Sequence, residues 1–174
     1  MIRLALPALA TVLAATSAIA QETVPASATV DAARAQIESL AAEMDVDGDA
    51  RISLDELQGA AAEIFPSIDA DGSDGLTRVE FLGWEFGLAE MAAFRGRTQG
   101  YEAAMGMVFD LFDRDGSQGI DAAEFETAMV ESHAYADLDG DAALSAAEFR
   151  SNFVVNVALR NALVPQEVLA ARRP

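Results

Sequence analysis

The chain has 174 residues and is 52% apolar, which is enough to bury the core of one domain, or two at most. Its formal net charge is −18 with no lysine, which argues against nucleic acid or an anionic membrane surface as partner. The lack of cysteine excludes a disulfide framework and a lipid-anchored lipoprotein.

Residues 1–20 have the organisation of a secretory signal peptide. Arg3 supplies the positive start, an apolar run follows, and an A-I-A cleavage motif stands at 18–20. The run is short for a membrane span and contains Pro7, so an uncleaved anchor is the weaker alternative. We therefore expect an exported bacterial protein, periplasmic or secreted, with no stable membrane span after cleavage.

Next comes a polar stretch, 21–28, which we expect to be a mobile lead-in. A helix is predicted over 29–44, because Ile37, Leu40 and Met44 recur at helical spacing. Without disulfides, an exported protein must be held together by its core or by bound metal.

Four twelve-residue segments then share one acidic pattern: loop 1 (45–56), loop 2 (69–80), loop 3 (113–124) and loop 4 (137–148). Each has Asp at positions 1 and 3, Asp or Ser at 5, Ile or Leu at 8, and Glu at 12. More than half of the 29 acidic residues lie in these loops. A solvated acidic face would not place them in register four times, so the pattern predicts metal binding.

This spacing matches the ligand positions of a calcium loop. Calcium takes about six to eight oxygens, which a twelve-residue loop supplies from positions 1, 3, 5, 7 (a carbonyl), 9 (through water) and 12 (bidentate). Magnesium is a weaker competitor, because it dehydrates reluctantly. The predicted ligands of up to four calcium ions are Asp45, Asp47, Asp49, Arg51, Ser53 and Glu56; Asp69, Asp71, Ser73, Gly75, Thr77 and Glu80; Asp113, Asp115, Ser117, Gly119, Asp121 and Glu124; and Asp137, Asp139, Asp141, Ala143, Ser145 and Glu148.

The spacing of the loops predicts how they pair. Only residues 57–68 separate loops 1 and 2, and 125–136 separate loops 3 and 4, which is room for one helix of about 18 Å in each case. Loops at opposite ends of one straight helix cannot lie side by side. We therefore expect loop 2 to pair with loop 3 and loop 4 with loop 1, unless a kink at Gly59 or Pro66 folds loops 1 and 2 together.

The rest of the chain fits a duplicated unit, because loops 3 and 4 repeat loops 1 and 2 with a period of 68 residues. A polar, glycine-bearing break is predicted at 95–100. The predicted domain covers 29–163, with loops 1 and 2 in 29–94 and loops 3 and 4 in 101–163, followed by a tail at 164–174.

Two apolar helix faces flank the second pair of loops. One leads into loop 3 and comprises Tyr101, Met105, Val108, Phe109 and Phe112. The other is predicted to run continuously out of loop 4 and comprises Phe149, Phe153 and Val157.

These loops resemble those of the EF-hand family, and FDLFDRDGSQGIDAAEF at 109–125 looks much like a calmodulin-type hand. With a signal peptide and four hands, the chain is similar to exported bacterial EF-hand proteins of the calsymin type. The resemblance covers roughly residues 30–160 and implies an all-α, helix-loop-helix fold with short β contacts between paired loops. It implies calcium binding but no particular protein partner, because the family includes both sensors and buffers.

One departure from the pattern concerns loop position 6, where a sharp turn favours glycine. Here it is Ala50, Asp74, Gln118 and Ala142. A left-handed backbone costs other residues about 1–2 kcal/mol, and Asp tolerates it best. Because about 1.4 kcal/mol is a tenfold change in affinity, we expect weak sites, with Kd about 10⁻⁵ to 10⁻³ M. Loops 1 and 4, with carboxylates at positions 1, 3, 5 and 12, are expected to differ in affinity from loops 2 and 3.

Other features carry less weight. His133 is the only histidine and has no cysteine partner for zinc, and the methionines and Trp84 are expected in the core rather than in a target groove. No nucleophile motif or phosphate loop is present, so an enzyme is the weakest hypothesis. The leading one is non-catalytic calcium binding, as a buffer or structural protein. The alternative is a calcium sensor that opens an apolar groove for an unidentified partner protein.

Overall fold

A computed structural model describes residues 26–84, 88–94 and 96–163. The predictions for the signal peptide 1–20, most of the lead-in and the tail 164–174 lie outside these residues. The elements in chain order are α1 (Ala26–Met44), β1 (Arg51–Ser53), α2 (Leu54–Ile68), β2 (Gly75–Thr77), α3 (Arg78–Gly83), α4 (Leu88–Phe94), α5 (Thr98–Phe112), β3 (Gly119–Asp121), α6 (Ala122–Ala136), β4 (Ala143–Ser145), α7 (Ala146–Asn152) and α8 (Val154–Leu163).

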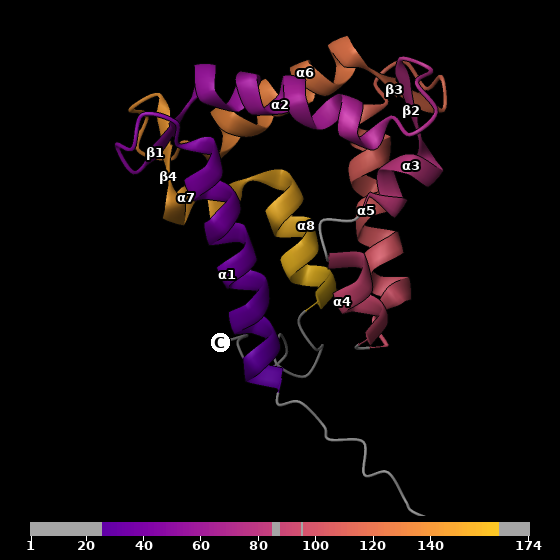
Figure 1. Ribbon diagram of the computed structural model, residues 1–174, viewed down its shortest axis with the longest axis horizontal. Coiled ribbons are helices and arrows are strands. Elements are labelled where there is room, and N and C mark those ends of the chain that lie inside the picture. The colour runs from indigo at the N-terminus through magenta and orange to yellow at the C-terminus, as the bar shows by residue number, and fades with distance from the viewer. Residues whose placement is uncertain (1–25, 85–87, 95, 164–174) are drawn as a thin grey trace, which may run out of the picture.

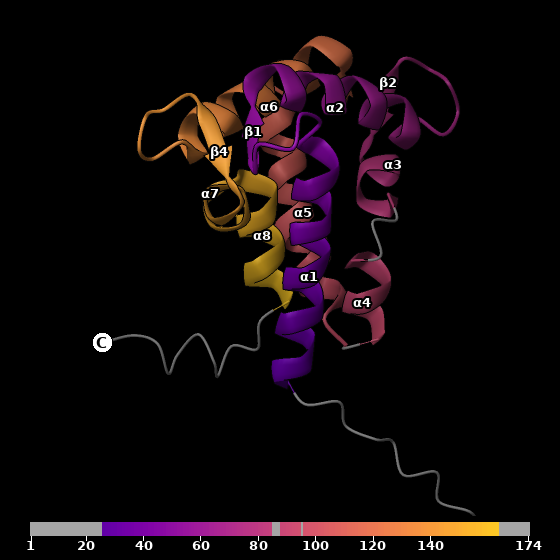
Figure 2. The same cartoon turned by 60° about the vertical axis from the view of Figure 1, so that its left-hand side comes forward.

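The helices form an arch. Figure 1 shows α2 and α6 side by side across the top, with α1 descending from one end and α5 from the other. Helix α8 lies between these two legs and contacts both, and Figure 2 shows the same arrangement from the side. The fold is therefore all-α apart from the three-residue strands in the loops, as predicted.

Loop pairing follows the predicted order. Strand β1 pairs antiparallel with β4, with Ile52 opposite Leu144, and β2 pairs with β3, with Leu76 opposite Ile120. All four side chains are at most 1% exposed. The cause is the one expected from the spacing, because α2 and α6 each run unbroken between two loops and hold them at opposite ends. Pro66 lies within α2 and does not fold loops 1 and 2 together.

The internal repeat is visible as an approximate two-fold axis through the α2–α6 pair. Gln58 donates a hydrogen bond to Glu126 at 3.1 Å, and these residues are 68 positions apart. A residue that contacts its own repeat-equivalent must lie close to the axis that relates the two halves. The axis exchanges loop 1 with loop 3 and loop 2 with loop 4, so it carries one loop pair onto the other.

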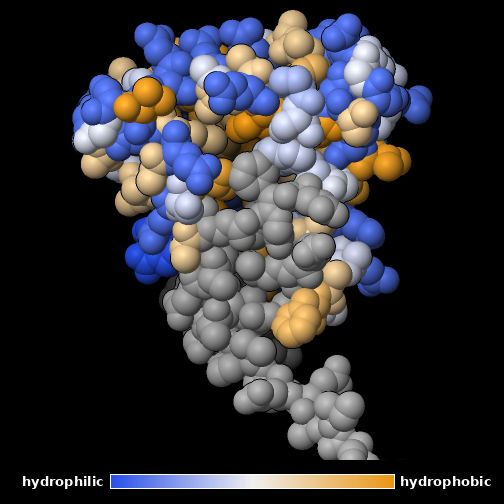
Figure 3. All heavy atoms as spheres, in the orientation of Figure 1, coloured by the Kyte–Doolittle hydropathy of each residue, from blue (hydrophilic) through white to orange (hydrophobic). Residues whose placement is uncertain are grey.

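The core contains the predicted helix faces. The apolar residues predicted on α5 are all buried, as are Met44, Met105 and Met129, whereas Met107 is 67% exposed. Trp84 is half-buried and packs against the core. Figure 3 shows the polar surface on one face of the described residues, with hydrophobic side chains in the hollow beneath α2.

Three predictions about helix limits need correction. The helix predicted over 29–44 begins at Ala26, inside the expected lead-in. Helix α5 begins at Thr98, so the break predicted at 95–100 is shorter, with Gly96 at φ +63° within it.

No described helix has the length and apolar character needed to cross a membrane.

The third correction concerns the helix after loop 4, which was expected to be continuous. It breaks at Phe153, whose backbone is extended (φ −62°, ψ 128°). The break redirects α8 against α5, so Asn156 and Leu159 are buried while Val157 is only half-buried. A single apolar stripe through Phe149, Phe153 and Val157 is therefore wrong, because two short helices with different faces replace it.

Candidate metal centres

The backbone of each loop turns through two left-handed residues. At position 4 the residue is always glycine, with φ between +69° and +76° at Gly48, Gly72, Gly116 and Gly140. At position 6 the non-glycine residues Ala50, Asp74, Gln118 and Ala142 adopt φ between +63° and +71°. The backbone cost anticipated from the sequence therefore applies to all four loops.

The first aspartate of each loop organises this turn by accepting backbone hydrogen bonds. In loop 1, Asp45 Oδ1 accepts from Gly48 N (2.9 Å) and Asp49 N (3.0 Å), and Oδ2 accepts from Ala50 N (2.8 Å). The position 6 amide makes the same bond in the other loops, at 2.9 Å to Asp69, 3.0 Å to Asp113 and 3.0 Å to Asp137. The turn thus draws the backbone around one carboxylate.

The last glutamate of each loop is fixed by a capping box at the start of the exiting helix. In loop 1, Ser53 is the N-cap of α2, its backbone N–H and hydroxyl both donate to Glu56 Oε2 at 2.8 Å, and Glu56 N–H donates back to Ser53 Oγ. The same bonds join Thr77 to Glu80 and Ser145 to Glu148, whereas Asp121 and Glu124 exchange only the two bonds donated by their backbone N–H groups. Each glutamate is therefore held facing its loop before any ion arrives.

These hydrogen bonds also keep the glutamates ionised. Donation from the Ser53 backbone N–H and hydroxyl lowers the pKa of Glu56 to about 2. The Ser145 hydroxyl and backbone N–H do the same for Glu148, whose pKa falls to about 2. The hydroxyl and N–H of Thr77 lower the pKa of Glu80. Since hydrogen bonds to a carboxylate favour its charged form, these groups are anionic at neutral pH.

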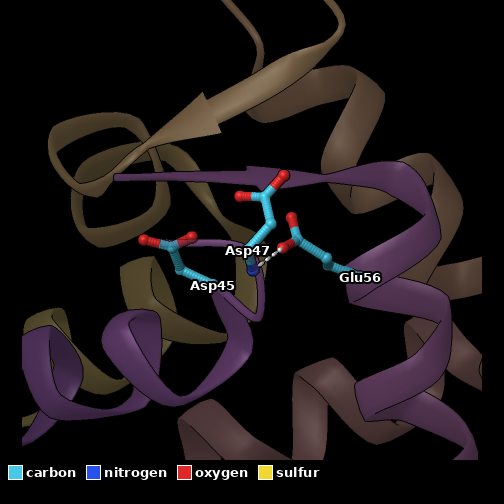
Figure 4. Close-up of side chains that lie close together, drawn as sticks. All are labelled: Asp45, Asp47 and Glu56. Carbon is cyan, nitrogen blue, oxygen red and sulfur yellow. Dashed lines mark hydrogen bonds between the residues drawn. The ribbon is translucent and has the colours of Figure 1, made fainter. Parts of the chain in front are cut away.

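The structure brings the predicted carboxylate ligands together in compact groups. In each group, one oxygen from each of three residues lies within 4.8 Å of the others. Figure 4 shows the first group, in which Asp47 N–H also donates to Glu56 Oε1 at 3.3 Å. The groups are Asp45, Asp47 and Glu56; Asp69, Asp71 and Glu80; Asp113, Asp115 and Glu124; and Asp137, Asp139 and Asp141.

Positions 5, 7 and 9 are placed less uniformly. Ser73 and Ser117 at position 5 donate to the position 7 carbonyls of Gly75 (3.0 Å) and Gly119 (3.2 Å), so two predicted ligands bond to each other. Position 9 serves as the helix N-cap in every loop, a role that its S/T/D-x-x-E pattern could have predicted. The position 7 residues are the first residues of the four strands: Arg51, Gly75, Gly119 and Ala143.

The donor set fits a hard divalent cation. Carboxylate, hydroxyl and carbonyl oxygens are the groups that calcium prefers, and each loop gathers several without a nitrogen or sulfur ligand. One oxygen in loop 3 points to the same conclusion. Among the described residues, Asp113 Oδ1 is a buried side-chain atom with no hydrogen-bond partner. A buried oxygen without a partner is costly, and a cation at this position would satisfy it.

Two contacts at loops 1 and 4 were not predicted from the sequence. The Arg51 side chain crosses from β1 and forms an ion pair with Asp141, a predicted ligand of loop 4. His133 is 4% exposed, and its Nε2 lies 3.1 Å from the Ile52 carbonyl. A carbonyl can only accept, so Nε2 carries the proton. Both contacts depend on the pairing of β1 with β4 and therefore leave no local sequence signal.

Comparison with known proteins gives one partial similarity. A protein of Oryza sativa subsp. japonica described as "Probable calcium-binding protein CML16" is 38% identical over 101 residues, which are 53% of this chain and 56% of that protein. The chain thus matches little more than half the length of this relative. No family model and no solved structure matches the chain. The helical architecture, the short paired strands and the four acidic clusters are consistent with EF-hands.

Proposed function

We propose that this protein binds calcium through its four loops and has no catalytic role. The observation that carries the proposal is a compact group of three carboxylates in each of the four loops, drawn from positions 1, 3 and 12 in loops 1 to 3 and from positions 1, 3 and 5 in loop 4. The similarity to a protein described as calcium-binding supports it. The oxygen-only donor sets favour calcium, and magnesium competes weakly because it dehydrates reluctantly.

The proposal includes low affinity. The left-handed residues at position 6 are alanine in loops 1 and 4, aspartate in loop 2 and glutamine in loop 3. Alanine and glutamine there carry a backbone cost of about 1–2 kcal/mol that glycine would avoid, and aspartate carries a smaller one. We therefore expect dissociation constants of about 10⁻⁵ to 10⁻³ M, which include the range of about 10⁻⁴ to 10⁻³ M typical of extracellular calcium modules.

The position of α8 supports a buffer or structural role over a sensor role. A sensor exposes an apolar groove that receives a partner's helix. In this protein, α8 itself lies between α1 and α5, with Leu159 and Leu163 buried. Asn156 anchors it, because its Nδ2 donates to the Phe149 carbonyl at 3.0 Å. The chain thus fills its own groove.

Little room remains in the apolar centre of the arch, although a separate groove of about 610 Å³ also borders α8 at Val154 and Val157. The apolar cavity at the centre of the arch, lined by residues such as Met44, Phe112 and Leu159, has a volume of about 90 Å³. A helix is about 10–12 Å across with its side chains, so a partner helix could enter this centre only by displacing α8. A sensor that used the apolar centre would therefore require calcium to release α8, whereas a buffer requires no such movement.

Export is the remaining part of the proposal. It is supported by the signal-peptide pattern at 1–20 and by the low expected affinity, since calcium outside the cytosol is plentiful enough to fill weak sites. Sequencing the N-terminus of the protein recovered from a bacterial periplasm or medium tests it. Recovery only in the cytosol with residues 1–20 attached would contradict it.

The calcium proposal is tested by calorimetric titration of metal-stripped protein, with magnesium as the comparison ion. We expect four sites for calcium and weaker heats for magnesium. Each of the variants Glu56→Gln, Glu80→Gln, Glu124→Gln and Glu148→Gln should weaken one site by at least about tenfold, since even outer-shell partners of metal ligands are worth about 10- to 100-fold. Wild-type protein that takes up no calcium at millimolar concentration would refute the function.

Binding of an apolar fluorescent dye separates the buffer from the sensor. With α8 in place, we expect the same dye fluorescence with and without calcium. A calcium-dependent increase would show that the apolar centre opens, and would favour the sensor. The variant Leu159→Asp, which places a charge in the buried face of α8, provides the positive control because it should raise dye binding without calcium.

A further inference from the structure

Position 7 distinguishes loop 1 from the other loops. The residues there are Arg51, Gly75, Gly119 and Ala143, so only loop 1 has a charged side chain at this position. The antiparallel register places Arg51 opposite Ser145, which directs it toward loop 4. Its Nη1 donates to Asp141 Oδ2, and the two residues are 90 positions apart in the chain.

Arg51 contacts the Asp141 oxygen that accepts no backbone hydrogen bond among the described residues. Asp141 Oδ1 already accepts the Ala143 N–H at 3.1 Å, which leaves Oδ2 as its free oxygen. In loop 1 the equivalent residue, Asp49, accepts the Arg51 N–H through Oδ1 at 2.8 Å. Among the hydrogen bonds of the described residues, none reaches Asp49 Oδ2. Loop 1 therefore offers this oxygen to an ion, whereas in loop 4 a guanidinium is bound to it.

The charges around Asp141 explain why the guanidinium is held there. Loop 4 is the loop whose compact group contains position 5, since Asp137, Asp139 and Asp141 lie within 4.8 Å of one another. Such crowded carboxylates repel each other, and a nearby cation offsets the repulsion. The hydrogen bond to Asp141 raises the pKa of Arg51, with further contributions from Asp139 and Asp49. The Arg51 hydrogen bond in turn lowers the pKa of Asp141.

We propose that Arg51 sets the calcium affinity of loop 4, as a tethered cation that calcium must displace from Asp141 Oδ2. This inference rests on the calcium-binding function proposed above and adds a regulator of one site. It makes loop 4 a weaker site than loop 1, although both carry carboxylates at positions 1, 3, 5 and 12. It also links the two loops, because the Arg51 carbonyl is a predicted ligand of loop 1 and its guanidinium contacts a predicted ligand of loop 4.

The test is Arg51→Gln, with Arg114→Gln as the matched control. Arg114 lies at position 2 of loop 3 and pairs at 2.7 Å with Glu131, which is not a predicted ligand, so both variants remove one charge and one exposed ion pair. Calcium binding is followed by NMR through the position 4 glycine amides, one in each loop: Gly48, Gly72, Gly116 and Gly140.

We expect Arg51→Gln to tighten binding reported by Gly140 roughly three- to tenfold, because the competitor and its repulsion of the ion are both removed. Arg114→Gln should change each loop by less than about twofold. In an Asp141→Asn background, which keeps an oxygen ligand at position 5, Arg51→Gln should change the affinity by less than about twofold, since the partner charge is gone.

A second readout separates this role from simple support of the fold. Without calcium, Arg51→Gln should lower the melting temperature by about 1–3 °C, because the carboxylates of loop 4 lose their counter-ion. Stability and affinity thus change in opposite directions, whereas a structural arginine would lower both. Unchanged or weaker binding at Gly140 in Arg51→Gln, or an equal gain in Arg114→Gln, overturns the inference. Wild-type protein that binds no calcium would instead refute the proposed function itself.

Discussion

The two loop pairs have the same backbone turns and the same ligand positions, but different surroundings. Strands β2 and β3 lie beside an aromatic cluster, in which Phe112 meets Phe81 and Phe125 edge-on at centroid distances of 5.9 and 6.0 Å. Strands β1 and β4 are instead tied by polar contacts, from His133 to the Ile52 carbonyl and from Arg51 to Asp141. A duplicated unit has thus kept its metal-site geometry while its support has diverged.

This difference can be traced to single positions of the 68-residue repeat. The equivalent of His133 is Phe65, whose ring meets Phe125 edge-on at 5.6 Å. The equivalent of Phe112 is Met44, which is also buried but lacks an aromatic ring. The equivalent of Arg51 is Gly119, which has no side chain to reach the partner loop. We therefore expect one pair to depend mainly on apolar packing and the other mainly on buried and interfacial polar contacts.

The largest expected effect is the loss of aromatic packing at loops 2 and 3. Phe112→Ala should lower the free energy of unfolding by about 3–5 kcal/mol, through lost burial and enlargement of the adjoining cavity. Met44→Ala, at the equivalent position, should cost about 2–4 kcal/mol, because no ring pairs are lost with it. Chemical denaturation of the calcium-free protein measures both.

Phe112→Leu is the matched control for this comparison. It keeps most of the apolar volume and removes only the edge-on ring contacts, so it should cost about 1–2 kcal/mol. If Met44→Ala proved as costly as Phe112→Ala, the aromatic cluster would have no special role in supporting loops 2 and 3.

An intermediate effect is expected from the buried histidine at loops 1 and 4. His133→Phe restores the residue type of the equivalent position but removes the donor to the Ile52 carbonyl. Loss of this one hydrogen bond to a buried carbonyl should cost about 0.5–1.5 kcal/mol. Amide hydrogen exchange should therefore quicken at Ile52 and Leu144, while Leu76 and Ile120 in the other pair stay protected.

His133→Gln tests whether the donor or the ring matters. Its side-chain amide keeps an N–H within reach of the same carbonyl, so it should recover part of the protection that His133→Phe loses. Equal loss of protection in both loop pairs would show instead that His133 supports α6 as a whole.

The sequence predicts the shared features of the two loop pairs better than their differences. The ligand positions, the single helices α2 and α6 and the pairing of β1 with β4 all follow from spacing, which is a local property of the chain. The contact of His133 with Ile52 joins residues 81 positions apart, and that of Arg51 with Asp141 joins residues 90 apart. The break at Phe153 likewise depends on how α8 packs against α5. Such features become visible only once the tertiary fold is known.

The smallest expected effect is a change in the free energy of unfolding that comes from backbone strain at loop position 6. Ala142 of loop 4 and Asp74 of loop 2 occupy equivalent left-handed positions, at φ +69° and +63°. Ala142→Gly removes about 1–2 kcal/mol of strain, part of which is offset because glycine gains about 0.4–1 kcal/mol of freedom in the unfolded chain. It should therefore stabilise the calcium-free protein by roughly 0.5–1 kcal/mol.

Asp74→Gly should leave the free energy of unfolding almost unchanged, because aspartate tolerates the left-handed conformation better than alanine. Gly140→Ala is the reverse control, since it adds strain at φ +73° with no atom near the new methyl group, and after the same unfolded-state offset it should destabilise the protein by roughly 0.5–1 kcal/mol. Urea denaturation of the three variants makes the comparison. If Asp74→Gly stabilised the protein as much as Ala142→Gly, residue type at position 6 would not distinguish the loops. The affinity difference between the pairs would then have to come from side chains around the ion, of which Arg51 is the first to test.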